Sequence, residues 1–393
     1  MRYRRFGRTN LEMPVFSCGG MRYQQSWDDL PPGDIKDDGQ ANLEATIRRS
    51  LEVGVNHIET ARGYGSSEMQ LGRILPTLPR DEMIVQTKVA PQDNADEFLR
   101  VFDKSMDYLQ LDHVDLLGLH GVNNPELVDK CLRKDGALAA ARKLQAEGRV
   151  RHVGFSTHGL PRDILACIES DEFDYVNLHC YYFDQRNAAA ITAATERDMG
   201  VFIISPSDKG GKLYEPPPRL AELCQPLTPM GFNDLFCLED PRVHTLSLGA
   251  ARPSDFDAHL DILPLLDTAE SAIAPIIARL DARAREAMSD HWVDHWAEHL
   301  PTWEEAPGEI PIYHVLRLYA MWRSFDMLEF AKMRYNLLGE GGHWFPGTKI
   351  DPTALAGIGE ALAASPVADQ LEVVLSEAHA AFNAEAQKRL SES

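Results

Sequence analysis

The feature that most constrains the fold is a regular alternation of helical and strand-like segments along the first 250 residues. In residues 42–53, Leu43, Ile47 and Leu51 recur every four positions, which places them on one face of a helix, and Gly54 ends that helix. Short β-rich runs separate such helices. The predicted strands cover residues 15–18, 55–59, 83–88, 114–120, 150–156, 174–179, 201–205 and 243–248.

Strict alternation predicts a parallel sheet, because parallel strands need a long crossover that is normally a helix. Eight such repeats over about 250 residues match the size of a closed (β/α)₈ (TIM) barrel. The structural alternative is a doubly wound open sheet. The segment Ser17-Cys18-Gly19-Gly20-Met21 lacks the third glycine of the dinucleotide fingerprint that would support that alternative. We therefore predict a barrel over residues 1–262.

The composition changes after residue 262. Five of the six tryptophans lie between Trp292 and Trp344, amid helical spacing, and Ala-rich helices are predicted in residues 354–389. We expect residues 263–393 to form a smaller all-helical C-terminal domain. The three prolines at 216–218 predict an irregular loop before the last strand, within the barrel segment.

Charge and hydropathy exclude several classes of function. The formal net charge is −21 and the pI is about 5.1, so the chain repels phosphate backbones and anionic bilayers. No apolar run approaches the roughly 20 residues that a spanning helix needs, and no secretory signal is evident. The six cysteines contain no Cys-x-x-Cys pair, which favours reduced thiols over a zinc ribbon or an iron–sulfur site. We expect a cytoplasmic soluble protein that binds neither nucleic acid nor membranes, and homo-oligomerisation stays open.

Four side chains that could do acid–base chemistry follow consecutive predicted strands. Glu59 and Tyr64 come at the end of the second strand, Lys88 ends the third, and His120 ends the fourth. Barrel enzymes carry their chemistry at the carboxyl ends of the strands, so these groups are expected on one rim. An ammonium beside a phenol lowers the pKa of the phenol. Taken singly, each residue has a structural explanation, such as an ordinary ion pair for Glu59 and Lys88.

Further motifs stand at fixed places along the chain. Ser67-Glu68-Met69-Gln70-Leu71-Gly72 follows the tyrosine, Gly19-Gly20-Met21 follows the first strand, Gly154-Phe155-Ser156 ends the fifth, and Ser205-Pro206 ends the seventh. With these motifs and the four rim residues, the chain resembles the aldo/keto reductase superfamily over about residues 1–262. In that family an opening hairpin, here residues 3–13, plugs the barrel floor.

The resemblance implies an NAD(P)-dependent oxidoreductase that transfers a hydride between a nicotinamide cofactor and a carbonyl or alcohol substrate. By position, Tyr64 would be the general acid/base, Lys88 and Glu59 its tuning pair, and His120 the residue that orients the carbonyl. Ser156 and Asn177 would bond the carboxamide, and backbone amides in residues 207–213 and 249–254 would hold the phosphates. The cofactor-binding residues implied in this way are Gly20, Met21, Ser156, Asn177, Ser205, Ser207, Lys209, Gly211, Gly249 and Arg252.

Three positions depart from the family pattern. Glu59 replaces the family aspartate, and its extra methylene displaces the pair with Lys88 by about one carbon–carbon bond. Ile204 stands where an aromatic ring often stacks on the nicotinamide. Asp255 would repel a 2′-phosphate that Arg252 could otherwise contact, so the choice between NAD and NADP stays open.

Arg22 and Arg62 follow the first two strands and are candidate substrate-binding residues. Two cations in so acidic a protein would suit an anionic substrate. Ion pairing with protein carboxylates is the alternative interpretation.

The C-terminal part offers one further pattern. His291, His295 and His299 stand four residues apart on one helix face, a spacing that can chelate zinc. A packing or solvated face is the alternative, and because no fourth ligand is evident we predict no metal site. Some relatives append a domain with iron–sulfur clusters, but no cysteine follows Cys237 here.

Two other functions remain open at this point. A nicotinamide sensor or assembly protein of low activity would keep the barrel, and the three departures would support it. Cofactor-independent carbon-acid chemistry, such as isomerisation, could use the same rim.

Overall fold

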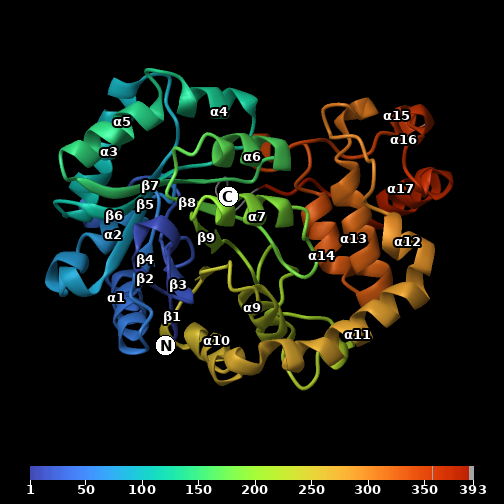
Figure 1. The fold of residues 1–393 in the computed structure, drawn as a ribbon, viewed down its shortest axis with the longest axis horizontal. Helices are drawn as coiled ribbons and strands as arrows, with labels where there is room; N and C mark the ends of the chain where they lie inside the picture. Colours follow the sequence, from blue (N-terminus) through green and yellow to red (C-terminus); the bar gives the residue numbers. More distant parts are fainter. Residues whose placement is uncertain (356, 389–393) are drawn as a thin grey trace. The chain divides into compact units, whose positions relative to one another are not determined.

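A computed structural model describes residues 1–355 and 357–388, and its first part is a closed barrel of eight parallel strands (Figure 1). Each strand pairs in parallel with the next, and the last pairs with the first. The barrel is confirmed, and the open-sheet alternative is wrong. The strands are β3 (Phe16–Gly19), β4 (His57–Glu59), β5 (Ile84–Val89), β6 (Val114–Leu119), β7 (Val150–Ser156), β8 (Tyr175–Leu178), β9 (Gly200–Ile203) and β10 (Thr245–Leu248).

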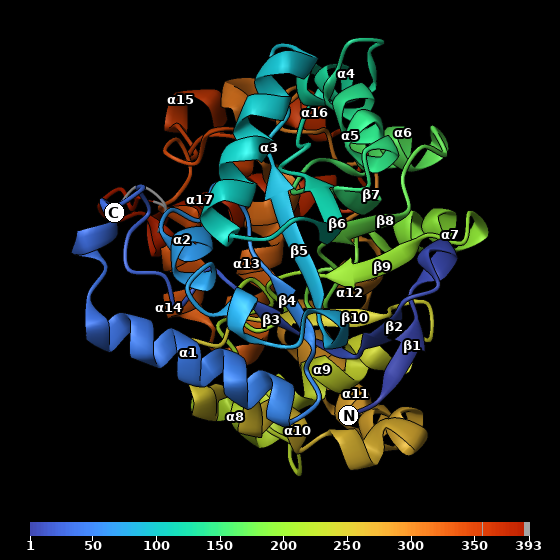
Figure 2. The ribbon, with the colours of Figure 1, turned by 90° about the vertical axis from the view of Figure 1, so that its left-hand side faces the viewer.

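The crossover helices lie outside the ring of strands, and Figure 2 shows β5 to β9 side by side in chain order. In one of them, α3 (Ala95–Leu109), the side chain of Asn94 accepts a hydrogen bond from the backbone N–H of Glu97 and caps the helix. Its apolar stripe, including Phe98 and Phe102, is buried. The other helices between β3 and β9 are α1 (Asp37–Glu52), α2 (Ser67–Leu71), α4 (Pro125–Leu132), α5 (Ala137–Ala146), α6 (Pro161–Glu169) and α7 (Ala188–Glu196).

A hairpin of β1 (Tyr3–Arg5) and β2 (Glu12–Pro14) precedes the barrel, as the resemblance implied. Its Arg4 donates a 3.1 Å hydrogen bond to the carbonyl of Asp240, which lies before β10, so the hairpin sits at the amino ends of the strands. Phe6, between the two hairpin strands, is fully buried in a cluster with Tyr175 and Phe202. The hairpin therefore closes the end of the barrel opposite to the rim.

The C-terminal region is helical, as predicted. Trp292 is buried in it, and the ring of Trp296 stacks on Tyr313 at 5.0 Å between centroids, so both tryptophans serve packing. In the core of this region α13 packs against α14 and α17. The helices of the region are α11 (Ala269–Met288), α12 (Asp290–His295), α13 (Ile312–Phe325), α14 (Leu328–Tyr335), α15 (Pro352–Leu355), α16 (Gly359–Leu362) and α17 (Ala368–Phe382).

The chain divides into two compact units. The first holds Met1–Pro206 and Asn233–Ala269, and the second holds Ser207–Phe232 and Glu270–Ser393. The segment after β9, with α8 (Pro218–Leu223) and the start of α9 (Pro229–Glu239), thus groups with the C-terminal helices. In the second unit, for example, Arg219 pairs with Asp326 at 2.7 Å. The predicted division into domains of residues 1–262 and 263–393 stays a prediction.

The histidine stripe has a structural explanation in the second unit. The rings of His291 and His295 lie 4.9 Å apart, and His295 pairs with Glu298 at 3.0 Å. Within residues 1–355 and 357–388, no three His, Cys, Asp or Glu side chains group as metal ligands would. Over the same residues no helix combines the length and apolar character needed to cross a membrane.

Replacing Phe6 by alanine tests the closing role of the hairpin. Removing a fully buried ring leaves a cavity, so the free energy of unfolding should fall by about 3–5 kcal/mol. Urea denaturation followed by circular dichroism measures this loss. The exposed Tyr3 on the same hairpin serves as the control, because Tyr3→Phe should cost at most about 1 kcal/mol. A loss below about 1 kcal/mol for Phe6→Ala would mean that the hairpin is not part of the cooperative core.

Candidate active site

The carboxyl ends of β4 and β5 bring a carboxylate and an ammonium into contact inside the barrel. Glu59 is 4% exposed and Lys88 is 1% exposed. The Nζ of Lys88 forms an ion pair with Oε2 of Glu59 and also donates to the carbonyl oxygen of Thr60 at 2.9 Å. The extra methylene of the glutamate therefore does not prevent the pairing.

Tyr64 lies next to this ammonium. The Nζ of Lys88 is 5.0 Å from the centroid of the Tyr64 ring. Burial would lower the pKa of Lys88, but the carboxylate of Glu59 and the Tyr64 hydroxyl outweigh it and raise that pKa above its ordinary value. Lys88 is therefore a permanent cation beside a phenol at neutral pH.

His120 completes the group of four. Its ring meets the ring of Tyr64 edge to face, with centroids 5.6 Å apart. Its backbone N–H donates to the carbonyl of Val89 at 2.8 Å, which continues the pairing of β5 with β6 by one residue. The four predicted catalytic side chains thus lie together, and their roles in a reaction stay predictions.

The turn that carries Tyr64 is fixed by a glycine. Gly65 has φ +54°, and a Cβ there would lie 2.0 Å from the carbonyl oxygen of Ser26. The N–H of Ser66 donates to the same oxygen at 2.9 Å. Only glycine allows this close approach, so the segment around Ser26 holds the tyrosine turn in place.

The second carboxylate oxygen of Glu59 makes a contact that the sequence did not predict. Ser247, on β10, donates its hydroxyl to Oε1 of Glu59 at 2.8 Å. Thr245 and Ser247 stand two positions apart on that strand and therefore share its inward face. This period of two was the available signal in the sequence.

A polar layer lies beneath the ion pair. His57, two residues before Glu59 on β4, is buried, and its Nδ1 lies 2.6 Å from the hydroxyl of Ser17. That hydroxyl lies 2.7 Å from the hydroxyl of Thr245. Burial and the charge of Lys88 lower the pKa of His57 to about 3, so its ring is neutral.

Two polar side chains stand side by side where the carboxamide of a nicotinamide is expected. Ser156 and Asn177 are register partners on β7 and β8. Asn177 is fully buried, and neither its Oδ1 nor its Nδ2 has a hydrogen-bond partner among the described residues. Buried amides are normally paired, and a carboxamide offers the matching donor and acceptor. These residues therefore fit the implied cofactor.

Other predicted cofactor residues lie at the same ends of the strands. Gly20 and Met21 follow β3, and a Cβ on Gly20 would lie 2.8 Å from the carbonyl of Glu59, so only a glycine fits there. Ser205 follows β9 in the left-handed conformation, with φ +53°. Gly249 follows β10.

The loop after β10 contains a carboxylate, that of Asp255, which bonds groups of the same loop. Asp255 accepts the backbone N–H of Ala251 at 2.9 Å and the Nε of Arg252 at 3.0 Å. The donors expected to hold a cofactor phosphate in this loop are thus partly used by a protein carboxylate.

The loop of residues 207–213 uses several of its backbone amides internally. Ser207, Lys209 and Gly211 belong to the second unit. The N–H groups of Gly211 and Lys212 donate to the carbonyl of Asp208, and that of Leu213 donates to the carbonyl of Ser207. The turn itself thus uses the amides of residues 211–213, and phosphate binding by this loop stays a prediction.

The two candidate substrate arginines differ. Arg62 pairs with Asp29 and Glu68, and its guanidinium lies 4.8 Å from the centroid of the Tyr108 ring. This geometry favours the ion-pair interpretation of Arg62. Arg22 is exposed, and its Cδ lies 2.7 Å from where a Cβ on Gly249 would be, so its side chain crosses the loop after β10. Substrate binding by either residue stays a prediction.

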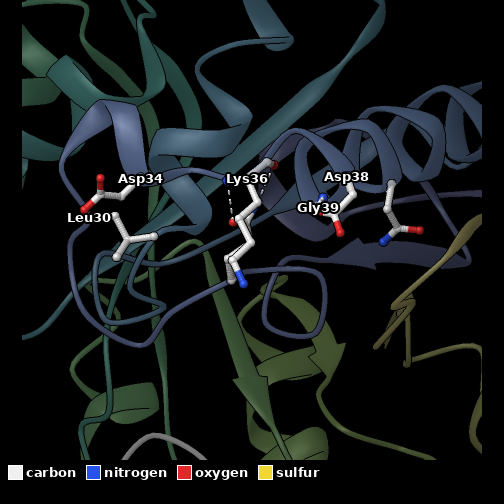
Figure 3. A pocket seen from close by; sticks show the side chains of 7 residues that line it. Leu30, Asp34, Lys36, Asp38 and Gly39 are labelled. Atoms are coloured by element: carbon white, nitrogen blue, oxygen red, sulfur yellow. Dashed lines mark hydrogen bonds between the residues drawn. The ribbon is translucent and has the colours of Figure 1, made fainter.

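A pocket of about 480 Å³ is lined by the segment between β3 and α1 and by the first turns of α1 (Figure 3). Gln25 and Lys36 bridge this segment, since the Gln25 side chain accepts the N–H of Lys36 at 2.8 Å and donates to its carbonyl at 3.1 Å. None of the residues lining the pocket is among the predicted site residues.

Comparison with known proteins adds independent findings. The family model "Aldo/keto reductase family" matches residues 16–211. L-galactose dehydrogenase of Arabidopsis thaliana is 30% identical over 190 residues, which cover 44% of this chain and 58% of the relative. D-threo-aldose 1-dehydrogenase of Pseudomonas sp. is 28% identical over 301 residues, covering 62% of this chain and 87% of the relative. The chain thus spans little more than half of the first of these relatives.

Solved structures agree in fold. The aldo-keto reductase AKR11C1 of Bacillus halodurans, in its holo form, superposes with a TM-score of 0.59 at 20% identity, over 70% of this chain and 96% of that one. The thermostable aldo-keto reductase Tm1743 gives a TM-score of 0.56 at 18% identity, over 69% of this chain and all of its own.

The neutral His57 predicts a pH dependence of stability. Unfolding would restore its pKa from about 3 to about 6.5, so the unfolded state binds an extra proton between these values. Stability should therefore fall as the pH drops through this window, by up to about 1.4 kcal/mol per pH unit from this residue. Urea unfolding at several pH values should show a shallower dependence for His57→Asn. The exposed His299→Asn should keep the wild-type slope, and equal slopes for all three proteins would contradict the assignment.

Proposed function

Because the barrel of this chain belongs to the aldo/keto reductase superfamily, we propose that it catalyses NAD(P)-linked oxidoreduction of a carbonyl/alcohol pair, with Tyr64 as general acid and base. The observation that carries this proposal is the buried Lys88 ammonium, paired with Glu59 and 5.0 Å from the centroid of the Tyr64 ring. An ion pair that only stabilised the fold would not require a tyrosine beside its ammonium.

This geometry supports the following proton transfer. In reduction the hydroxyl of Tyr64 donates its proton to the carbonyl oxygen of the substrate. In oxidation the tyrosinate takes the proton from the alcohol. The ammonium of Lys88 stabilises the tyrosinate in both directions, and His120, edge to face with the tyrosine ring, orients the substrate oxygen.

The nicotinamide, when bound, supplies or accepts the hydride at the carbon that changes oxidation state. Asn177 and Ser156 would bond its carboxamide, and Ile204 would cover one face of its ring. The buried, unpartnered amide of Asn177 supports this assignment. It also favours the nicotinamide enzyme over cofactor-independent isomerisation.

For the substrate we propose a cyclic aldose, whose hemiacetal hydroxyl at carbon 1 is oxidised to give a lactone. The names of the two sugar dehydrogenases among the relatives support the sugar class, and the name of the second also supports carbon 1. The pairing of Arg62 with protein carboxylates weakens the case for an anionic substrate. A screen of neutral aldoses, sugar acids, hydroxy acids and simple aldehydes with both cofactors would identify the class.

Replacing Tyr64 by phenylalanine tests the acid–base assignment. Loss of the transferable proton should lower kcat by at least about 100-fold while NAD(H) still binds. Steady-state kinetics and quenching of tryptophan fluorescence by NADH measure the two properties. Tyr3→Phe, at the opposite end of the barrel, should keep full turnover. Unchanged turnover in Tyr64→Phe would refute the role of Tyr64, and cofactor binding without turnover in the wild type would favour the sensor.

We also propose that the enzyme prefers NAD(H) to NADP(H), because a 2′-phosphate near Arg252 would meet the carboxylate of Asp255. Asp255→Ala should improve NADPH affinity by at least about fivefold relative to NADH, since it frees Arg252 and the Ala251 amide. Fluorescence titration with both cofactors measures the ratio of affinities. Asp261→Ala removes a nearby exposed charge and should leave the ratio unchanged. An equal ratio in Asp255→Ala and wild type would contradict the proposal.

A further inference from the structure

Glu59 holds its two carboxylate oxygens against different partners. Oε2 pairs with Lys88, whereas Oε1 accepts the hydroxyl of Ser247 at 2.8 Å. Ser247 is 8% exposed, and both residues lie inside the barrel. A carboxylate buried to this degree needs a donor at each oxygen, since an unpaired charged atom in the interior is costly.

Gly19 makes room for this arrangement. A Cβ at Gly19 would lie 3.0 Å from Oε1 of Glu59, 2.8 Å from the hydroxyl of Ser247 and 2.9 Å from the carbonyl of Leu248. The space that a side chain at position 19 would fill is therefore used by the far oxygen of the glutamate and by the serine. Gly19 is also the register partner of Glu59 on β3.

We propose that Ser247 is a positioning residue that turns the longer carboxylate of Glu59 so that the Lys88 ammonium stays available to Tyr64. This inference rests on the proposed function and adds a residue that the family motifs do not include. It explains how a glutamate can replace the family aspartate. Oε2 of Glu59 pairs with Lys88, while Oε1 reaches the hydroxyl of Ser247 on β10.

The hydrogen bond from Ser247 draws part of the negative charge of Glu59 away from Lys88. Without it the carboxylate would neutralise the ammonium more completely, and the ammonium would stabilise the tyrosinate less. His120 faces Tyr64 from β6. The ionisable groups that interact with Glu59 are Lys88 on β5, Cys18 on β3, Tyr23 after it and Tyr175 on β8.

Three substitutions at one position separate the hydrogen bond from packing. Ser247→Ala removes the donor, Ser247→Cys keeps the volume with a weak donor, and Ser247→Thr keeps the hydroxyl. The alanine and cysteine variants should lower kcat about 5- to 20-fold with little change in KM. In both, the pH of half-maximal alcohol oxidation should rise by about half a unit or more. The threonine variant should restore the wild-type values.

A second measurement needs neither cofactor nor substrate. Each variant is titrated by ultraviolet absorbance with Tyr64 present and again with Tyr64→Phe added. The difference between the two curves reports the ionisation of Tyr64. Ser247→Ala should move this ionisation to higher pH. In a Glu59→Ala background the same substitution should have no effect, because the carboxylate through which Ser247 acts is gone.

Thr245→Val is the matched control. It removes a hydroxyl from the same inward face of β10, and that hydroxyl contacts Ser17 rather than Glu59. It should leave the ionisation of Tyr64 unchanged even if stability falls. An unmoved ionisation in Ser247→Ala, or an equal shift in the Glu59→Ala background, would overturn the role of Ser247. Failure of the proposed function itself is a separate result, namely unchanged turnover in Tyr64→Phe.

Discussion

The buried pair of Lys88 and Glu59 is the interaction on which the chemistry of this molecule depends. Removing two charges from water costs several kcal/mol per ion, and the attraction between them offsets that cost only if every remaining donor and acceptor is satisfied. Here the carbonyl of Thr60 and the hydroxyl of Ser247 complete the two groups. The pair is therefore a fixed electrostatic element, and it contributes a cation that is held at one place beside a phenol.

The closed barrel is what makes such an element possible. Parallel strands deliver their carboxyl ends to one rim, so residues from β4, β5, β6 and β10 meet although they lie up to 188 positions apart along the chain. The opposite end is filled by Phe6 and its hairpin. One end thus carries the packing that stabilises the barrel, and the other carries the polar groups that burial alone would not favour.

The amino-acid sequence predicted the fold and the four central residues for a clear reason. Alternation of helix and strand is local, and Glu59, Tyr64, Lys88 and His120 each sit at the end of a local element. The contacts that were missed are not local. Ser247 reaches Glu59 only when β10 closes against β3, and Asp255 meets the Ala251 amide through the shape of a loop. The hydrogen bonds from the amides of residues 211–213 to carbonyl groups of the same loop depend in the same way on the fold of a turn.

The anchoring of the tyrosine turn by the Ser26 carbonyl divides the long connection between β3 and α1 into two parts with different freedom. Residues 25 and 26 are bound to the start of α2 through Ser66 and Gln70, so a shift there would be passed directly to the reacting hydroxyl. Asp28 and Asp34 lie beyond that anchor. The ends of their segment are joined by hydrogen bonds between the Gln25 side chain and the backbone of Lys36. Surface diversification by loop grafting is thus best confined to the stretch from 30 to 34, because Asp29 pairs with Arg62 and Ile35 is buried.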